Sequence, residues 1–334
     1  MRLLAGHRLP AKGLILPGHR LGGRDTLASV IASGGTETVI QDGANFYRVH
    51  TYTESGALTV TRGGLVEYLV VGGGGGGIRN GAFSNSRGGG GGAGGFQKFV
   101  EGEAGNTEAG PLALSAGSLA VTVGAGGPAQ NNGTQGKGGN SSIGALIESL
   151  GGGQGVSGNV TTPDASSDGG SGGGSSTDAQ ERGGLGTEGQ GNDGGLSGPA
   201  SLLLTGGGGG AGAAGGSGSG DSVSNAVCGD GGDGLATAIN GDERHYAAGG
   251  GGGLRDERSG TSRPGDGGIG GGGDGGSSSP DSLTGVRSGT DGEPNTGSGG
   301  GGGADSNAPA GSGADGIVII RYEITEAEYD AEVA

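Results

Sequence analysis

Uninterrupted runs of glycine limit what this chain can fold into more than any other feature. They include residues 72–77, 88–92, 206–210, 249–253, 270–273 and 299–303. Only 29% of the 334 residues are hydrophobic and 3% are aromatic, so a large conventional core is excluded. With 97 Gly and 10 Pro, the composition is typical of disordered chains, and the runs break the every-third-glycine period of collagen. Either the chain is disordered, or hydrogen bonds between backbone groups stabilise its fold in place of a large apolar core.

An ordered arrangement of glycine runs is physically available. Glycine can form polyproline-II-type helices, with about three residues per turn and a rise of about 3.1 Å, that have no internal hydrogen bonds. Such rods can pack side by side and pair their backbone groups with those of neighbouring rods, although glycine loses much backbone entropy on folding. Glycine-poor inserts interrupt the runs at 78–87, 159–168, 239–246, 254–264 and 277–287. We therefore expect rods joined by turns, with disorder as the alternative.

Strand signals surround the glycine-rich part. Apolar and β-branched segments begin at Thr36, Phe46, Ala57 and Leu65, and tight-turn dipeptides such as Asp42-Gly43 separate them. Few strand signals follow residue 150 until the apolar run 317–324. The sequence predicts a mainly β fold with little or no α-helix. It has a β-sandwich-like base over 36–148 closed by strand 317–324, and a bundle of polyglycine-II helices with loops over 150–316.

The two ends of the chain differ in charge. Residues 1–35 begin with five cations and one anion, Asp25, which gives a net charge of about +4. Because the whole chain has a net charge of −16, the remaining residues carry about −20. These cations are Arg2, Arg8, Lys12, Arg20 and Arg24. We interpret 1–35 as a basic docking arm, with a disordered leader as the alternative. Residues 326–334 form an acidic tail, and the capping-box spacing of Thr325 and Glu328 predicts a short exposed helix.

Several function classes receive no support. The net charge of −16 argues against nucleic acid, and a single cysteine with four histidines fits no usual zinc spacing. No apolar run approaches the ~20 residues that span a bilayer, so we expect no membrane insertion and a protein made in a cytoplasm. Gly136-Lys137 lacks the rest of a phosphate loop, and no catalytic grouping is recognisable. We expect no enzyme activity, no cofactor and no metal, although calcium in an Asp-rich loop stays open.

Paired sequence signatures point to a family. A strand running into glycine at 66–77, the segments 88–96, 121–127 and 141–147, and the closing strand at 314–322 occur in this order. The pattern resembles the glycine-rich domain of bacteriophage tail-fibre proteins over roughly residues 36–325. That resemblance implies a virion protein, assembled in the host cytoplasm, that binds a host surface glycan or outer-membrane receptor through loops. The basic arm and the acidic tail depart from the family pattern, and the arm would contact other virion proteins of the tail or capsid.

Candidate receptor contacts come from the inserts, because a glycine rod offers only backbone. Arginine and aromatic side chains most often anchor recognition, and acidic glycans or lipopolysaccharide phosphates would suit them. The candidates are Arg79, Phe83 and Arg87; Arg244, His245 and Tyr246; and Arg255, Arg258 and Arg263. The plain alternative is that these are solvated turn residues. A capsid decoration or head fibre without a receptor role is the competing function; irregular, charged inserts disfavour ice binding; and the oligomeric state, a homotrimer included, stays open.

Overall fold

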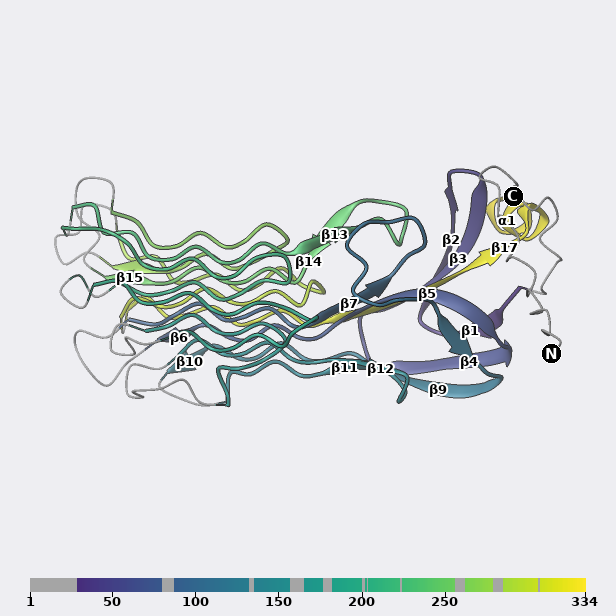
Figure 1. Ribbon diagram of the computed structural model, residues 1–334, viewed down its shortest axis with the longest axis horizontal. Coiled ribbons are helices and arrows are strands. Elements are labelled where there is room, and N and C mark those ends of the chain that lie inside the picture. The colour runs from purple at the N-terminus through teal and green to yellow at the C-terminus, as the bar shows by residue number, and fades with distance from the viewer. Residues whose placement is uncertain are drawn as a thin grey trace, which may run out of the picture.

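The computed structural model describes residues 29–79, 87–131, 135–156, 165–176, 182–199, 202, 204–222, 224–255, 262–278, 285–305 and 307–334. The molecule is elongated, with a β-sheet base at one end and a bundle of extended glycine segments at the other (Figure 1). The fold is mainly β, as the sequence predicts. Among the described residues only 326–333 form a helix.

The first sheet of the base contains the final strand of the chain at its centre. Its order is β2-β3-β17-β5-β7, and a further strand, β8, pairs with β5; all of these pairs are antiparallel. The strands are β2 (Thr36–Asp42), β3 (Asn45–Tyr52), β17 (Ile317–Ile324), β5 (Gly64–Val71), β7 (Phe96–Phe99) and β8 (Leu112–Leu114). Because β17 pairs with both β3 and β5, the chain leaves this sheet, builds the glycine bundle and returns.

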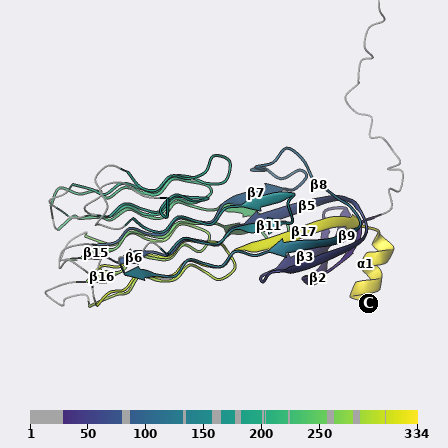
Figure 2. The ribbon, with the colours of Figure 1, turned by 90° about the horizontal axis from the view of Figure 1, so that it is seen from below.

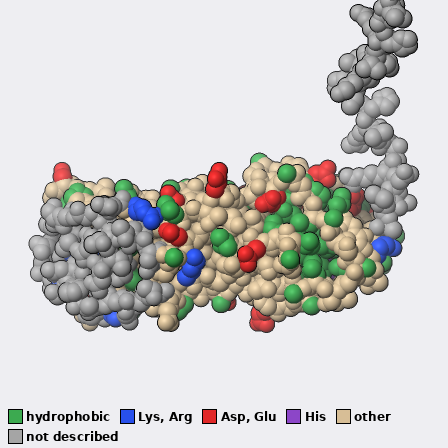
Figure 3. Space-filling model, turned by 60° about the horizontal axis from the view of Figure 1, so that its bottom comes forward, with side chains coloured by type: hydrophobic (Ala, Val, Ile, Leu, Met, Phe, Trp, Pro, Cys, Tyr) green, Lys and Arg blue, Asp and Glu red, His purple; other side chains and the backbone are tan. Residues whose placement is uncertain are grey.

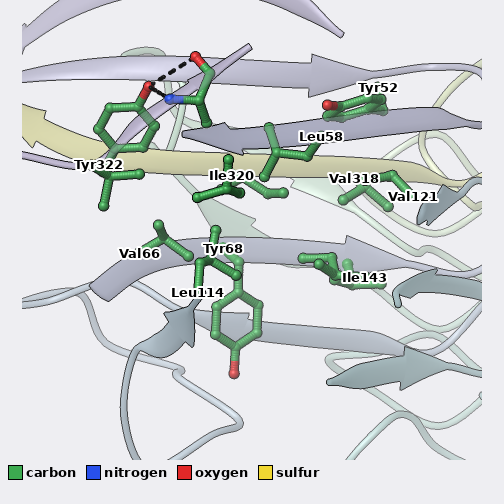
Figure 4. Packing of buried hydrophobic residues seen from close by; sticks show 14 of the residues in the cluster. Tyr52, Leu58, Val66, Tyr68, Leu114, Val121, Ile143, Val318, Ile320 and Tyr322 are labelled. Carbon is green, nitrogen blue, oxygen red and sulfur yellow. Dashed lines mark hydrogen bonds between the residues drawn. The ribbon is translucent and has the colours of Figure 1, made fainter. Parts of the chain in front are cut away.

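A second sheet packs against one face of the first. Its order is β1-β4-β9-β11-β12, from β1 (Ile31–Ser33), β4 (Gly56–Arg62), β9 (Gly117–Thr122), β11 (Ser141–Ile143) and β12 (Ile147–Ser149). Leu58, Val121 and Ile143 of this sheet meet Val318 and Ile320 of β17 in the main apolar core (Figure 4). Each such buried side chain contributes about 1.5–3 kcal/mol to folding. Strand β1 falls inside the expected arm 1–35, so the end of that segment belongs to the base.

The bundle is held by hydrogen bonds between glycine rods, as rod 72–77 shows. Its successive N–H groups donate to three neighbours in rotation, 88–95, 136–139 and 311–314, over N–O distances of 2.7 to 3.0 Å. Its carbonyl groups accept from rods 124–130, 150–155 and 299–303. Six neighbours therefore surround this rod, and the donors repeat every third residue, which is the period of a helix with three residues per turn. Rods 72–77, 88–95, 124–130 and 136–139 lie in the bundle, although the sequence analysis placed 36–148 in the base.

Glycine is required in these rods because the neighbouring backbone occupies the side-chain position. A Cβ added at Gly75 would overlap the carbonyl oxygen of Gly153, and one at Gly74 would overlap that of Ser298. Real Cβ atoms do not approach oxygen so closely, so the rods could not keep their spacing with any other residue at these two positions. The close packing that aliphatic side chains give an ordinary core is here given by the backbone itself.

Aspartates mark the outer rods. On several of them a carboxylate accepts a hydrogen bond from a neighbouring N–H that has no carbonyl partner: Asp315 from Gly126 at 2.7 Å and Asp233 from Ile269 at 2.8 Å. Aspartate and other residues recur every third position in these segments, as in Asp230-Gly-Gly-Asp233. The surface of the bundle accordingly shows backbone, small polar groups and scattered charges, while hydrophobic side chains gather over the base (Figure 3).

The acidic tail forms the helix that the sequence predicts. Helix α1 (Glu326–Val333) begins with a complete capping box, in which Thr325 Oγ1 accepts from the Glu328 N–H. Tyr329 packs against the Phe46 ring at a centroid distance of 4.9 Å, and Glu332 binds Arg48 at 2.8 Å, so α1 is fixed to the first sheet. The described chain contains no helix long and apolar enough to cross a membrane.

Candidate functional site: the tip of the glycine bundle

The end of the bundle opposite the base collects several of the candidate arginines; we call it the tip. Two short parallel strand pairs lie there: β6 (Ile78–Arg79) with β10 (Gln130–Asn131), and β15 (Leu254–Arg255) with β16 (Ser277–Ser278). Rods from distant parts of the sequence run side by side to this end (Figures 1 and 2). Buried aliphatic residues flank the ends of glycine rods at the tip, namely Ile78, Val156, Leu204 and Leu254. They give the glycine rods a fixed end.

Arg79 and Arg255, from two different inserts, both approach Asp305. Arg79 Nη1 lies 3.5 Å from the backbone oxygen of Asp305, and the charge of Arg255 acts on the Asp305 carboxylate. Burial opposes ionisation of Asp305, but the Ser278 hydroxyl, two backbone N–H groups and Arg255 together hold its pKa below the ordinary value. The structure therefore brings these two predicted residues together.

Arg263 makes the best-formed ion pair of the tip region. Its two terminal nitrogens meet the two carboxylate oxygens of Asp230 at 2.7 and 2.9 Å, and Asp266 lies 3.1 Å away. The hydrogen bond from Arg263 is the main reason that the pKa of Asp230 is lowered. Through these bonds Arg263 holds two outer rods together. Its side chain is 41% exposed, so it also reaches solvent.

Arg87 is buried, which the sequence analysis did not anticipate. The residue is 2% exposed and lies near Cys228, whose thiol donates to the Gly253 carbonyl at 3.2 Å. Burial raises the pKa of Cys228. This small interior cluster also contains Leu204 and Leu254. In this structure Arg87 supports the tip from inside and presents no contact surface.

The insert 239–246 lies at the wrong end of the rods for a shared site with the tip. Strands β13 (Leu235–Thr237) and β14 (Arg244–Tyr246) form a hairpin at the junction between bundle and base (Figure 1). Tyr246 is 1% exposed and packs with Phe96 and Ile239 against the outer face of the first sheet. The insert expected to form an exposed loop instead covers this face, and we call residues 235–246 the clasp. The sequence did not reveal this position, because a pattern of rods and turns does not tell at which end a turn falls.

Polar bonds fix the clasp to the base. The Glu103 carboxylate accepts from Thr237 Oγ1 at 2.8 Å, the Ala238 N–H at 3.0 Å and Lys98 Nζ at 2.7 Å. Arg321, itself 1% exposed, donates to the Ile239 carbonyl at 3.3 Å.

On the solvent side of the clasp, Arg244 binds Glu293 at 2.7 Å. Arg244 also lies over the Tyr246 ring, and His245 beside it is only partly buried. Arg244 and His245 therefore keep some exposure at the junction, away from the tip.

The last group of candidates lies outside the described residues, and one arginine at the tip was not among the candidates. Phe83 and Arg258 lie outside the described residues, as do Arg2, Arg8, Lys12, Arg20 and Arg24. Arg287, which the sequence analysis did not select, is exposed at the tip and pairs through its backbone with Ser277. Its position in the glycine-poor insert 277–287 is the sequence signal that could have found it.

One pocket of about 190 Å³ lies at the junction, lined by Phe96, Gln190, Asn192 and Leu235 among others. The Gln190 amide already binds the Leu150 N–H and the Glu148 carbonyl, and the Asn192 amide binds two rod carbonyls. These side chains hold the junction together and leave little to recognise a ligand. Over the described ranges, no three His, Cys, Asp or Glu side chains are grouped to hold a metal ion.

The geometry defines a class of protein in which a base of β-sheets carries a bundle of hydrogen-bonded glycine rods. Comparison with known families agrees: the model of the glycine-rich domain matches residues 51–323, and the chain belongs to that family. A search of curated proteins found no significant match.

Proposed function

We propose that this chain is a virion structural protein of a phage-like particle, a tail-fibre or tail-tip component that binds the host surface with the tip of its glycine bundle. The observation that supports this most is the separation of the two ends. The described chain starts at Ser29 beside β1 and ends in α1, both at the base, whereas β6 and β15, which contain the candidates Arg79 and Arg255, lie at the tip (Figure 1). A protein held at its base presents the tip outward.

The chemistry of the tip favours an anionic ligand. Arg79, Arg255, Arg263 and Arg287 come from three inserts of a chain whose net charge is −16. Guanidinium groups form forked hydrogen bonds with phosphate and carboxylate, so an acidic glycan or a lipopolysaccharide phosphate on the host would fit. Binding and structural support, with no catalysis, no cofactor and no metal, complete the proposal. The basic arm would contact other virion proteins.

Adsorption of particles to host cells tests the proposal. One variant replaces the exposed tip residues Arg263 and Arg287 with Ser, and a second replaces residues 80–86 by a Gly/Ser segment of equal length. The matched control changes Asn240, Asp242 and Glu243, all exposed at the turn of the clasp, to Ser. We expect the tip variants to lose adsorption roughly tenfold or more, as loss of recognition anchors does elsewhere, and the control to keep it.

Equal adsorption by the tip variants and the control would contradict the adhesin proposal and favour the alternative, a capsid decoration or head fibre. Electron microscopy of particles labelled on this protein separates tail from capsid directly. A truncation that lacks residues 1–28 tests the arm: we expect a folded protein that is absent from particles, and normal incorporation would contradict an anchoring role.

A further inference from the structure

His50 occupies a position unlike that of any other histidine among the described residues. It lies in β3, and its side chain has no exposed surface. Its Nδ1 is 2.8 Å from the Gly34 carbonyl oxygen, and its Nε2 is 3.1 Å from the Tyr322 hydroxyl. Gly34 belongs to the connection that follows β1, and Tyr322 belongs to β17. The imidazole therefore joins the central strand of the base to the end of β1.

The Tyr322 hydroxyl extends this link to β1 itself. It lies 3.3 Å from the Ala32 N–H and 3.5 Å from the Ala32 carbonyl oxygen (Figure 4). Strand β1 has three residues, and its pairing with β4 shifts register between Ile31 and Ala32. Apart from this pairing, Arg62 binds the preceding Ser29 carbonyl at 2.6 Å. The bonds through Tyr322 and His50 thus add to the β4 pairing and to the burial of Val30 and Ala32 in fixing so short a strand.

The neutral imidazole satisfies every group in this chain of bonds. A carbonyl oxygen can only accept, so Nδ1 carries the hydrogen and donates to Gly34. Nε2 then accepts from the Tyr322 hydroxyl, which in turn accepts from the Ala32 N–H. No group of the set needs a second proton.

A proton added at Nε2 would break the set. The new N–H would point at the Tyr322 oxygen, whose own hydrogen would have to turn to the Ala32 carbonyl at 3.5 Å, a poor distance for a hydroxyl donor. The positive charge would also stand in a site without solvent contact. Protonation therefore costs both a hydrogen bond and a desolvated charge.

The charged groups that face His50 do not offset this cost. Glu37 of β2 is 3.8 Å from Nδ1, but it already accepts from the Gly34 N–H at 3.1 Å and from Arg48 at 3.3 Å. Arg48, two residues before His50 on β3, opposes a second positive charge. The other titratable neighbours are the phenols of Tyr322 and Tyr52, and burial raises the pKa of Tyr52 to about 12, so both are neutral. Desolvation is the main cause that lowers the pKa of His50, ahead of the opposing Gly34 and Glu37.

We propose that His50 is an acid-sensitive latch: protonation of its buried imidazole loosens β1, and with it the point where residues 1–28 join the base. The sign follows from the lowered folded-state pKa. Stabilisation by neutral His50 is complete above the ordinary pKa of about 6.5, and it is lost as the pH falls below that value toward the folded-state pKa. Mild acid thus frees the junction to the arm while the two-sheet core stays folded.

Hydrogen exchange of the full-length protein tests the latch at about pH 7.5 and about pH 5, after correction for the intrinsic pH dependence of exchange. We expect protection of the Ile31–Ser33 amides to fall roughly tenfold at the lower pH, and protection of Val318–Ile320 to stay unchanged. His50→Gln keeps a donor and an acceptor but takes up no proton, so its protection should not respond to pH. His245→Gln, at the junction, is the matched control and should respond as the unaltered protein does.

Unchanged protection of Ile31–Ser33 at the lower pH would overturn the proposal, and so would an equal fall in His50→Gln. Glu37→Gln gives a second test should His50→Gln fail to fold, because Glu37 is a third exposed and tolerates change. Without this carboxylate the charged imidazole is less favoured and the folded-state pKa of His50 falls further, so the loss of protection should still begin near the ordinary pKa but extend to lower pH, which lowers its midpoint. An unmoved midpoint would contradict the assignment to His50.

Discussion

At the scale of single residues, this protein uses glycine where other proteins use aliphatic side chains. Most rod glycines form backbone hydrogen bonds with neighbouring rods, and at many of them, such as Gly74 and Gly75, a neighbouring carbonyl oxygen lies where the Cβ would stand. The aspartates of the outer rods complete the scheme by accepting from N–H groups that no rod covers. A residue in this bundle is therefore judged by the room at its Cβ and by its backbone partners rather than by its hydropathy.

Gly75→Ala tests this principle against a matched glycine. The added methyl group would overlap the Gly153 carbonyl and push two rods apart, whereas Gly110 has nothing within 4 Å of its Cβ position. We expect Gly75→Ala to lower the free energy of unfolding by about 3 kcal/mol or more, and thus the melting temperature by roughly 5 °C or more. Gly110→Ala should melt within about 1 °C of the unaltered protein. Calorimetry of both variants checks the difference, and equal melting temperatures would refute the packing argument.

At the scale of elements, much was predictable from sequence because strands obey simple patterns. The apolar run 65–71 suggests a strand covered on both faces, and β5 does lie between the second sheet and the clasp. The capping box of α1 was also readable, since Thr325 and Glu328 are local neighbours. The position of the clasp was not predictable, because Tyr246 is buried by Phe96 and Ile239, which are distant in sequence or hidden in an insert. Burial of Arg87 escaped notice for the same reason.

The clasp gives a prediction that reverses the one from sequence. The sequence analysis selected Arg244, His245 and Tyr246 as exposed residues of an insert, which predicts that replacing all three leaves stability unchanged, but Tyr246 is 1% exposed. Tyr246→Ser should cost about 3–5 kcal/mol, as removal of a buried aromatic side chain does, while Arg244→Ser should cost less than about 1 kcal/mol because its ion pair is exposed. Chemical denaturation of the two single variants measures this. Near-equal midpoints would show that the clasp does not pack as described.

Helix α1 has its own test. Thr325→Ala removes the hydroxyl that accepts from the Glu328 N–H and should cost the helix about 1 kcal/mol, whereas Thr325→Ser keeps an acceptor. We expect faster amide exchange over residues 327–333 in Thr325→Ala only. Identical exchange in both variants would mean that Tyr329 on Phe46 and Glu332 on Arg48, rather than the cap, hold the helix.

At the scale of the whole molecule, the glycine bundle separates the base from the tip (Figure 1). The sequence indicated rods and turns, and it selected Arg79, Arg255 and Arg263, which the fold brings to the tip from the two inserts 78–87 and 254–264. It could not assign turns to ends, since that depends on how many rods precede each turn. A repeat of non-glycine residues at every third position, as at Asp230 and Asp233, marks outer rods and is a signal to use in related sequences.

The central claim is that backbone hydrogen bonds between rods, in place of a large apolar core, make the glycine bundle a stable structure. Hydrogen exchange of Gly72–Gly77, the rod enclosed by six others, measures this most directly. We predict that these amides exchange as slowly as those of Ile317–Ile324 in the apolar core, because all six donate within 3.0 Å and the rod is fully buried. Exchange of Gly72–Gly77 at the rate of an unfolded chain, with the β17 amides still protected, would contradict the account.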